Sequence, residues 1–407
     1  MDEKRLQSYA RLIVQKGINP EPGQDVILIA GLDQPEFVRT VVKACYEQGA
    51  GKVIVDWVDM PCSRLDQLYQ SQERLSAVEP WELARLQWRV EKLPALLWLD
   101  SDDPDGMDGI DPEKRAKAQM ARYPLIKPLR DAMENRFQWC IAGVPGKAWA
   151  QKVFPGIPAE EAVEKLWEAI LCAARANGDP IANWEQHNRT IHGRTEKLNA
   201  LKFRELIYKS ANGTDLRVGL IPEGIFAGAA EKDLSGREFN PNIPSEEIFT
   251  SPMRGRAEGI VYATKPLSWQ GSLIEDFCIR FENGRAVEVK ARKGQEVLEK
   301  MISMDEGAAC LGECALIDCD SPINNMGILF YSTLYDENAS CHLALGRGFE
   351  NCIRDYGSYK QEELRAMGIN DSMIHVDFMI GTSDLDITGI AEDGSEIPIF
   401  RNGSWCF

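Results

Sequence analysis

Apolar residues in the first half of the chain form short continuous runs, which alternate with stretches that have a helical repeat. Strands buried on both faces carry such runs, and we predict strands at residues 26–30, 52–57, 95–100 and 138–145. After the first run, Phe37, Val41 and Cys45 recur at helical spacing, and a second helical pattern extends from about Pro158 to Ser210. Strands that alternate with helices predict a parallel sheet covered by helices.

The second half of the chain is richer in β-prone segments, which are separated by Gly, Asn and Pro. These segments lie at residues 214–221, 259–264, 276–292, 314–318 and 328–333. One of them contains Asn283 and Gly284, whose tolerance of positive φ angles predicts a hairpin with a type I′ turn. Because 407 residues exceed the usual size of a single core, we predict an α/β fold with two domains. An N-terminal α/β domain with a parallel sheet would occupy residues 1–200, and a β-rich α+β domain would occupy residues 201–407.

The charge and composition of the chain narrow the class of protein. A formal net charge of -17 argues against a nucleic-acid partner, because affinity for phosphate backbones comes largely from Lys and Arg. An acidic surface tolerates cationic partners, such as peptides with a free ammonium group. The N-terminus is charged and has no apolar signal-peptide core, and no apolar run is long enough to span a membrane. With eleven cysteines in such a chain, we expect a cytoplasmic protein without a membrane partner.

Two of the four histidines lie among carboxylates. His375 and Asp377 are two residues apart in a β-prone segment, so a strand would point both side chains to one face as a pair of metal ligands. The alternative is an ordinary polar pair that satisfies its own hydrogen bonds. Glu337 precedes His342 by five residues, with Asp336 beside it, and the segment from His342 onward is predicted to begin a helix. The alternative there is a helix cap with a solvated acid.

Further carboxylates in the second half enlarge the set of candidate ligands. Glu313 interrupts an otherwise apolar strand, where a carboxylate is costly unless it is paired or bound to a metal. Glu246 and Glu247 are adjacent acids before an apolar β-prone pair. Such a mixture of carboxylates and imidazoles suits one or two Zn, Co or Mn ions, and its size favours a two-metal hydrolase site. By contrast, His187 and His192 lie in a polar helical stretch and are expected to be solvated surface residues.

Several long stretches of the second half resemble the aminopeptidase T family of metallo-aminopeptidases. These stretches span most of residues 210–407 and read NPNIPSEEIFTSP, RAEGIVYATKPL, LGECALIDCDSPI, GILFYSTLYDENASCHLALGRG, SMIHVDFMIG and FRNGSWCF. The resemblance implies an enzyme that removes N-terminal residues from short peptides with a free N-terminus. It also implies a homodimer, and a C-terminal domain that binds a co-catalytic pair of divalent Zn, Co or Mn ions.

The resemblance further implies roles for individual residues. Six positions match the metal ligands of the family: Glu247, Glu313, Glu337, His342, His375 and Asp377. Glu313 corresponds to the carboxylate that bridges the two ions, and the motif alignment prefers Glu247 over Glu246. Both Glu313 and Glu246 remain open as the catalytic carboxylate that moves the proton. Phe349 is a departure, because the family often has a Tyr at this position, seven residues after the first His ligand.

Two other functions remain as alternatives. A ring-cleaving dioxygenase on a related fold would use a single Fe(II) held by a Glu, a His and an Asp. The presence of six candidate ligands favours the two-metal peptidase over this reading. A non-catalytic peptide-binding relative is the second alternative. The intact ligands disfavour it, although Phe349 keeps it open.

Overall fold

The computed structural model describes residues 1–269 and 272–407, which divide into two compact units. The first unit contains residues 1–186 and 230–245, and the second contains residues 187–229 and 246–407. The domain boundary near residue 200 stays a prediction about which parts fold independently. In the part of the chain that the structure describes, every helix is too short or too polar to cross a membrane.

The first unit is built on a five-stranded parallel sheet with the order β10-β4-β3-β1-β2. Its strands are β1 (Val26–Gly31), β2 (Val53–Val58), β3 (Ala95–Asp100), β4 (Trp139–Gly143) and β10 (Asn242–Ile243). The four predicted strands of the first half are therefore confirmed. Strand β1 pairs with β3 on one side and β2 on the other and is mostly buried, which explains its continuous apolar run.

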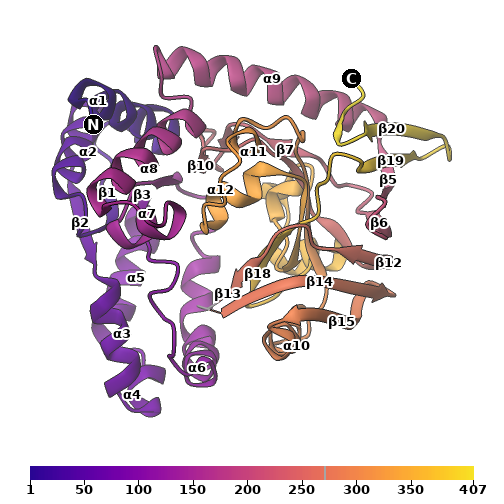
Figure 1. Ribbon diagram of the computed structural model, residues 1–407, viewed down its shortest axis with the longest axis horizontal. Helices are drawn as coiled ribbons and strands as arrows, with labels where there is room; N and C mark the ends of the chain where they lie inside the picture. Colours follow the sequence, from indigo (N-terminus) through magenta and orange to yellow (C-terminus); the bar gives the residue numbers. More distant parts are fainter. Residues whose placement is uncertain (270–271) are drawn as a thin grey trace. The chain divides into compact units, whose positions relative to one another are not determined.

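Helices surround this sheet and extend beyond it (Figure 1). They are α1 (Glu3–Leu12), a π-helical segment (Ile13–Ile18), α2 (Pro35–Glu47), α3 (Met60–Tyr69), α4 (Gln72–Ser76), α5 (Pro80–Lys92), α6 (Pro112–Asp131), α7 (Lys147–Val153) and α8 (Ala159–Ala173). The predicted helical repeat is confirmed in α2, where Phe37, Val41 and Cys45 are buried. A small ribbon of β8 (Glu231–Lys232) and β9 (Glu238–Phe239) completes the unit.

The helical pattern predicted from Pro158 to Ser210 is wrong at its C-terminal end. Helix α9 (Pro180–Leu201) contains residues of both units, and the chain then continues as strand β5 (Phe203–Lys209). This strand pairs with β6 (Asp215–Leu220) on one side and β19 (Asp386–Ala391) on the other. Pairing on both sides overrides the local helical repeat, because it satisfies the backbone groups while Leu206 and Tyr208 become buried.

Strand β5 belongs to a nine-stranded sheet in the second unit. The order is β13-β14-β12-β6-β5-β19-β20-β21, with β15 paired to β14. The remaining strands are β12 (Pro252–Tyr262), β13 (Leu267–Trp269), β14 (Ser272–Glu282), β15 (Arg285–Lys293), β20 (Glu396–Arg401) and β21 (Ser404–Trp405). The predicted hairpin is confirmed between β14 and β15, where Asn283 has a φ of 50° and Gly284 a φ of 76°.

A second, five-stranded antiparallel sheet carries the candidate ligands. Its order is β18-β17-β16-β11-β7, for β7 (Ala227–Gly228), β11 (Ile248–Thr250), β16 (Leu311–Leu316), β17 (His342–Gly346) and β18 (His375–Met379). Cys314, Leu343, Leu345, Val376 and Phe378 belong to the apolar core of the unit. Neighbouring side chains in a strand point to opposite faces. The residues of β16, β17 and β18 that alternate with these core residues therefore form a separate, polar face of the sheet.

Short helices connect the strands of the second unit. They are α10 (Gln295–Ile302), α11 (Pro322–Asn325), α12 (Thr333–Asp336), α13 (Gln361–Met367) and the 3₁₀ turns Glu337–Ala339, Glu350–Cys352 and Tyr356–Ser358.

Two further predictions for this unit are wrong. The segment that begins at His342 is not a helix but strand β17, because β16 and β18 pair with it on both sides. The β-prone segment 328–333 contains no strand. The backbone N–H of Phe330 donates to Asp336 Oδ1 at 2.9 Å, and Tyr331 has a φ of 56°, which an extended strand does not accommodate.

Candidate active site

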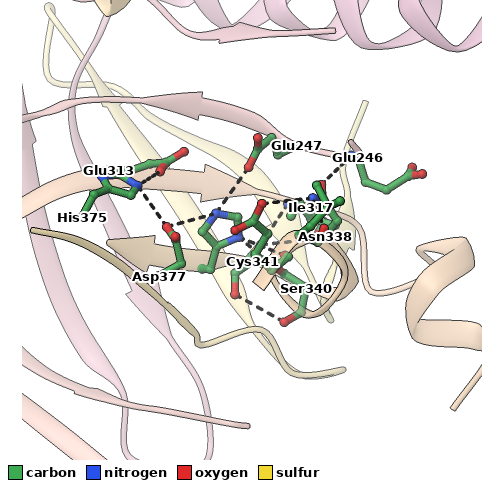
Figure 2. A network of polar contacts seen from close by, with 12 residues as sticks. Glu246, Glu247, Glu313, Ile317, Asn338, Ser340, Cys341, His375 and Asp377 are labelled. Atoms are coloured by element: carbon green, nitrogen blue, oxygen red, sulfur yellow. Dashed lines mark hydrogen bonds and ion pairs between the residues drawn. The ribbon is translucent and has the colours of Figure 1, made fainter. Parts of the chain in front are cut away.

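The six candidate ligands lie on or beside the polar face of the five-stranded sheet. Glu247 precedes β11, Glu313 lies in β16, and Glu337 begins the 3₁₀ turn before β17. His342 is the first residue of β17, and β18 contributes the remaining two candidates, His375 and Asp377. The side chains that Figure 2 labels from this group face one another across the sheet, and the prediction that His375 and Asp377 share one strand face is confirmed.

Strand register brings the central carboxylates together. Glu313 of β16 and Asp377 of β18 both pair with Ala344 of β17, so the three residues form one row across the sheet. Residues in one row point to the same face. The small side chain of Ala344 lies between the two carboxylates, which leaves space on the polar face above it.

Two overlapping groups of side chains have the spacing of metal ligands. In the first, ligand atoms of Glu247, Glu313 and His342 lie within 4.8 Å of one another, and in the second the same holds for Glu313, His375 and Asp377. His342 Nε2 lies 3.3 Å from Glu247 Oε2, and His375 Nε2 lies 3.1 Å from Glu313 Oε2. Glu313 is common to both groups.

Backbone carbonyls orient the two imidazoles. His342 Nδ1 lies 3.0 Å from the carbonyl oxygen of Glu337, and His375 Nδ1 lies 2.7 Å from that of Arg347. Because a carbonyl oxygen only accepts, each Nδ1 donates its proton to it. Each Nε2 is thereby directed at the carboxylates, which is the arrangement found in metal-binding histidines.

Burial and mutual repulsion perturb the acids of this site. Only 3% of Glu313 is exposed, and burial raises its pKa, as do the charges of Glu247 and Asp377. Burial and the same two neighbouring carboxylates raise the pKa of Glu337 well above its usual value. Asp377 differs, because the imidazole of His375 outweighs burial and lowers its pKa.

The same environment raises the pKa values of the two imidazoles, because the neighbouring carboxylates favour the charged form. Burial lowers the pKa of His342, but the carboxylates of Glu247, Glu313 and Asp377 outweigh it and raise the pKa to about 10. The pKa of His375 is likewise raised well above its usual value by Asp377 and Glu313, against the effect of burial. The site therefore attracts positive charge strongly.

This donor set fits divalent metal ions. Asp377 Oδ1 is buried and accepts no hydrogen bond from the residues that the structure describes, although His375 Nε2 lies 3.3 Å away. A buried carboxylate oxygen without a donor is costly unless a cation binds it. Carboxylate oxygens and imidazole nitrogens in this ratio suit Zn, Co or Mn.

Glu246 and Phe349 occupy different surroundings from the six candidates. The half-buried side chain of Glu246 points away from the other carboxylates, and its backbone N–H donates to Asn338 Oδ1 at 2.7 Å (Figure 2). Phe349 follows β17, and its ring centroid lies 4.8 Å from that of His375. The structure thus brings the Phe349 ring to the site and leaves the Glu246 carboxylate outside it.

The structure corrects one prediction outside the site and adds residues that the sequence did not single out. His187 is buried in α9 with 9% exposure, so its assignment as a solvated residue is wrong, whereas His192 is exposed and lies 3.3 Å from Glu196.

The residues that the structure adds to the site are Asn338, whose side chain is fully buried, and Arg347, whose carbonyl orients His375. No local sequence signal separates a buried Asn from an ordinary turn Asn.

The sequence and the structure of this chain are similar to those of known proteins. The sequence model of the thermophilic metalloprotease (M29) family matches residues 2–405. Aminopeptidase AmpS of Bacillus subtilis is 41% identical over 406 residues, which cover 99% of each chain. Aminopeptidase T of Thermus thermophilus is 40% identical over 99% of this chain and 98% of its own. The solved structure of wild-type AmpT from Thermus thermophilus aligns over 100% of both chains with a TM-score of 0.90 and 39% identity, which confirms the predicted fold class.

Proposed function

Because the chain belongs to the thermophilic metalloprotease (M29) family and is a metal-dependent aminopeptidase, we propose that it removes N-terminal residues from short peptides with a free N-terminus, using a co-catalytic pair of divalent metal ions. The observation that carries the metal pair is the overlap of two ligand groups at Glu313, each with its ligand atoms within 4.8 Å. A carboxylate that belongs to both groups has the position of a bridging ligand.

The ligand groups assign residues to the two ions, for which Zn, Co or Mn are the candidates. Glu247 and His342 would hold one ion, His375 and Asp377 the other, and Glu313 would bridge them. Glu337 lies outside these two groups and would be the sixth ligand, as the resemblance implies; its carboxylate interacts electrostatically with members of both groups. When bound, such ions would coordinate the free α-amine of the substrate, polarise the scissile carbonyl and lower the pKa of a water molecule.

The protein's own residues would move the proton. Glu313 is one candidate for the group that accepts a proton from water and returns it to the leaving amine, because it is the carboxylate common to both ligand groups. Glu246 is the second candidate. Its carboxylate points away from the ligand groups, so this role would require the side chain to rotate.

The alternatives account for fewer of these features. A ring-cleaving dioxygenase with a single Fe(II) would leave one of the two ligand groups without a role, and a non-catalytic peptide-binding protein would leave both without one. The relatives are named aminopeptidases, which supports the peptidase over the dioxygenase and over the non-catalytic protein.

We also propose a cytoplasmic homodimer that binds neither nucleic acid nor membranes. Large apolar side chains are exposed on α3, α5 and α6, and a second copy would remove them from water. They are Leu65, Leu68, Tyr69, Trp81, Met120 and Leu125. All eleven cysteines are free thiols, as expected in a reducing compartment. The net charge of -17 supports the absence of a nucleic-acid partner.

An activity assay with matched substrates tests the proposed reaction. Metal-loaded protein should hydrolyse aminoacyl fluorogenic amides with a free amine and leave their N-acetylated forms intact, because an acetylated amine no longer binds a metal. A chelator should abolish the activity, and Co, Zn or Mn should restore it. Equal rates on free and acetylated substrates would reject the exopeptidase mechanism, and one metal ion per chain at saturation would reject the pair.

A further inference from the structure

The Asn338 side chain makes three hydrogen bonds beside the candidate ligands. It is fully buried, in the 3₁₀ turn between Glu337 and Ala339. Its Oδ1 accepts from the backbone N–H of Glu246 at 2.7 Å. Its Nδ2 donates to the carbonyl oxygen of Leu334 at 2.9 Å and to Glu337 Oε1 at 3.4 Å. The amide therefore uses its acceptor and both of its donors.

These bonds join two ligand-bearing segments, the loop that contains Glu246 and Glu247 and the stretch that runs from Leu334 to His342. Glu246 is the neighbour of Glu247, so its N–H fixes the loop that carries the Glu247 carboxylate. The bond to Glu337 Oε1 orients a second carboxylate, and the carbonyl of Glu337 in turn lies 3.0 Å from His342 Nδ1. The Asn338 amide thus ties the loop that carries Glu247 to the stretch that carries Glu337 and His342.

The other ligand group is positioned by different means. Glu313 and Asp377 lie in one row of the sheet through their shared partner Ala344, and His375 is oriented by the Arg347 carbonyl. Strand pairing holds these side chains, and among the described residues the Asn338 side chain hydrogen-bonds with Glu246, Leu334 and Glu337 rather than with this group. Glu247 and His342 are therefore positioned through the turn that contains Asn338, whereas His375 and Asp377 are held by strand pairing and by the Arg347 carbonyl.

From this asymmetry we infer that Asn338 is a positioning residue that sets the affinity of one metal position, the one formed by Glu247, Glu313 and His342. The inference rests on the proposed metal pair. Interactions that orient metal ligands typically change metal affinity by about 10–100-fold. Replacing Asn338 should therefore weaken one of two binding steps and leave the other unchanged.

Only an amide can make this set of bonds. An aspartate at position 338 would keep the acceptor for the Glu246 N–H but lose both donors, and its charge would repel the Glu337 carboxylate. A leucine of similar shape would lose all three bonds. Asn338→Asp therefore tests the donors, and Asn338→Leu tests the whole connection.

The test is a titration of the metal-free protein, as the whole chain, with Co²⁺. The visible absorption of the ion and calorimetry both monitor the binding steps. Two reference variants identify the steps: Glu247→Gln should weaken the step of the first group, and Asp377→Asn that of the second. We expect Asn338→Asp and Asn338→Leu to weaken the step that Glu247→Gln weakens, by about 10–100-fold, while the other step keeps the wild-type affinity.

A matched control separates this effect from general destabilisation. Asn240 is also buried, and its Nδ2 donates to the carbonyl oxygen of Lys16 at 2.7 Å in the first unit. Asn240→Asp should lower the melting temperature and leave both Co²⁺ steps unchanged. Equal weakening of both steps in the Asn338 variants, or a lowered melting temperature with neither step changed, would overturn the inference. A wild-type protein with a single step would instead overturn the metal pair itself.

Discussion

At the scale of single residues, Phe349 provides a test of catalysis, because the resemblance to the aminopeptidase T family implies a Tyr at this position. Its ring is half-buried and lies 4.8 Å from the ring of His375 and 5.4 Å from that of Phe249. If the usual hydroxyl donates to the carbonyl oxygen as charge develops on it, the donor contributes about 3 kcal/mol to the transition state. We therefore expect Phe349→Tyr to raise kcat by about 10²-fold with little change in KM.

Steady-state kinetics and the melting temperature of this variant would decide between two roles of Phe349. The alternative is that the ring packs against Phe249 and His375 and that another group supplies the donor. In that case the added hydroxyl leaves kcat unchanged, and it lowers the melting temperature if it is buried without a partner. That combination would assign Phe349 to packing alone.

His375 and Asp377 allow a second prediction at the same scale. Both side chains belong to the polar face of β18, so their loss opens a coordination position without creating a cavity in the apolar core. His375→Ala and Asp377→Ala should each reduce activity by several orders of magnitude while the melting temperature of the metal-free protein changes little. The exposed His192 is the control, and His192→Ala should match the wild type in both measurements. Near-normal turnover of either β18 variant at saturating metal would remove this strand from the site.

Some of these residues are recognisable from the sequence, and others are not. Glu313 stands out because a carboxylate in a run of apolar residues needs a partner, and the spacing of His375 and Asp377 places both on one strand face. Asn338 gives no such signal, because its role depends on the Glu246 N–H, ninety-two positions away in the chain. The orientation of Glu246 is equally unpredictable, since adjacent acids are chemically identical and only the fold separates them.

At the scale of elements, strands with continuous apolar runs were predictable, and strands defined by distant pairing were not. The runs of β1 and β3 identify buried parallel strands, and Asn283-Gly284 identifies the β14–β15 hairpin. Strand β5 continues a helical repeat, and β17 follows a turn that resembles the start of a helix. Both become strands because partners on each side pair with them, and a local pattern contains no information about such partners.

The turn of the β14–β15 hairpin gives a prediction at this scale. Gly284 has a φ of 76°, and a Cβ at this position would overlap the backbone of Gly255. Gly394 has a φ of 82° with no atom within 4 Å of such a Cβ, so it serves as a matched control. Gly394→Ala should cost about 1–2 kcal/mol, from the left-handed conformation alone. Gly284→Ala should cost more, because the steric overlap adds to it. Chemical denaturation of both variants checks the difference, and equal losses would contradict the overlap.

At the scale of the whole molecule, the site links metal binding to pH and to stability. Without metal, Glu313 and Glu337 have raised pKa values and His342 has a pKa of about 10. The folded state then holds protons more tightly than the unfolded chain at each of these groups. Their contribution to stability is fully present below the unfolded pKa and is lost as the pH rises through the folded one. Asp377 has the opposite sign because its pKa is lowered from 3.8, so its contribution to stability changes only at more acidic pH.

The metal-free protein should therefore lose stability as the pH rises from about 6.5, the usual pKa of a histidine, toward about 10, the pKa of His342. Metal should stabilise the protein increasingly over the same range. Metal must displace the protons of these groups, so its affinity rises with pH. A ligand at 100 times its dissociation constant stabilises the folded state by about 2.7 kcal/mol per site. Melting temperatures with and without chelator at several pH values would measure this widening gap. Glu313→Gln should narrow it, since it removes the carboxylate common to both ligand groups. A gap that is independent of pH, or one that survives Glu313→Gln unchanged, would show that metal stabilises the protein at some other site.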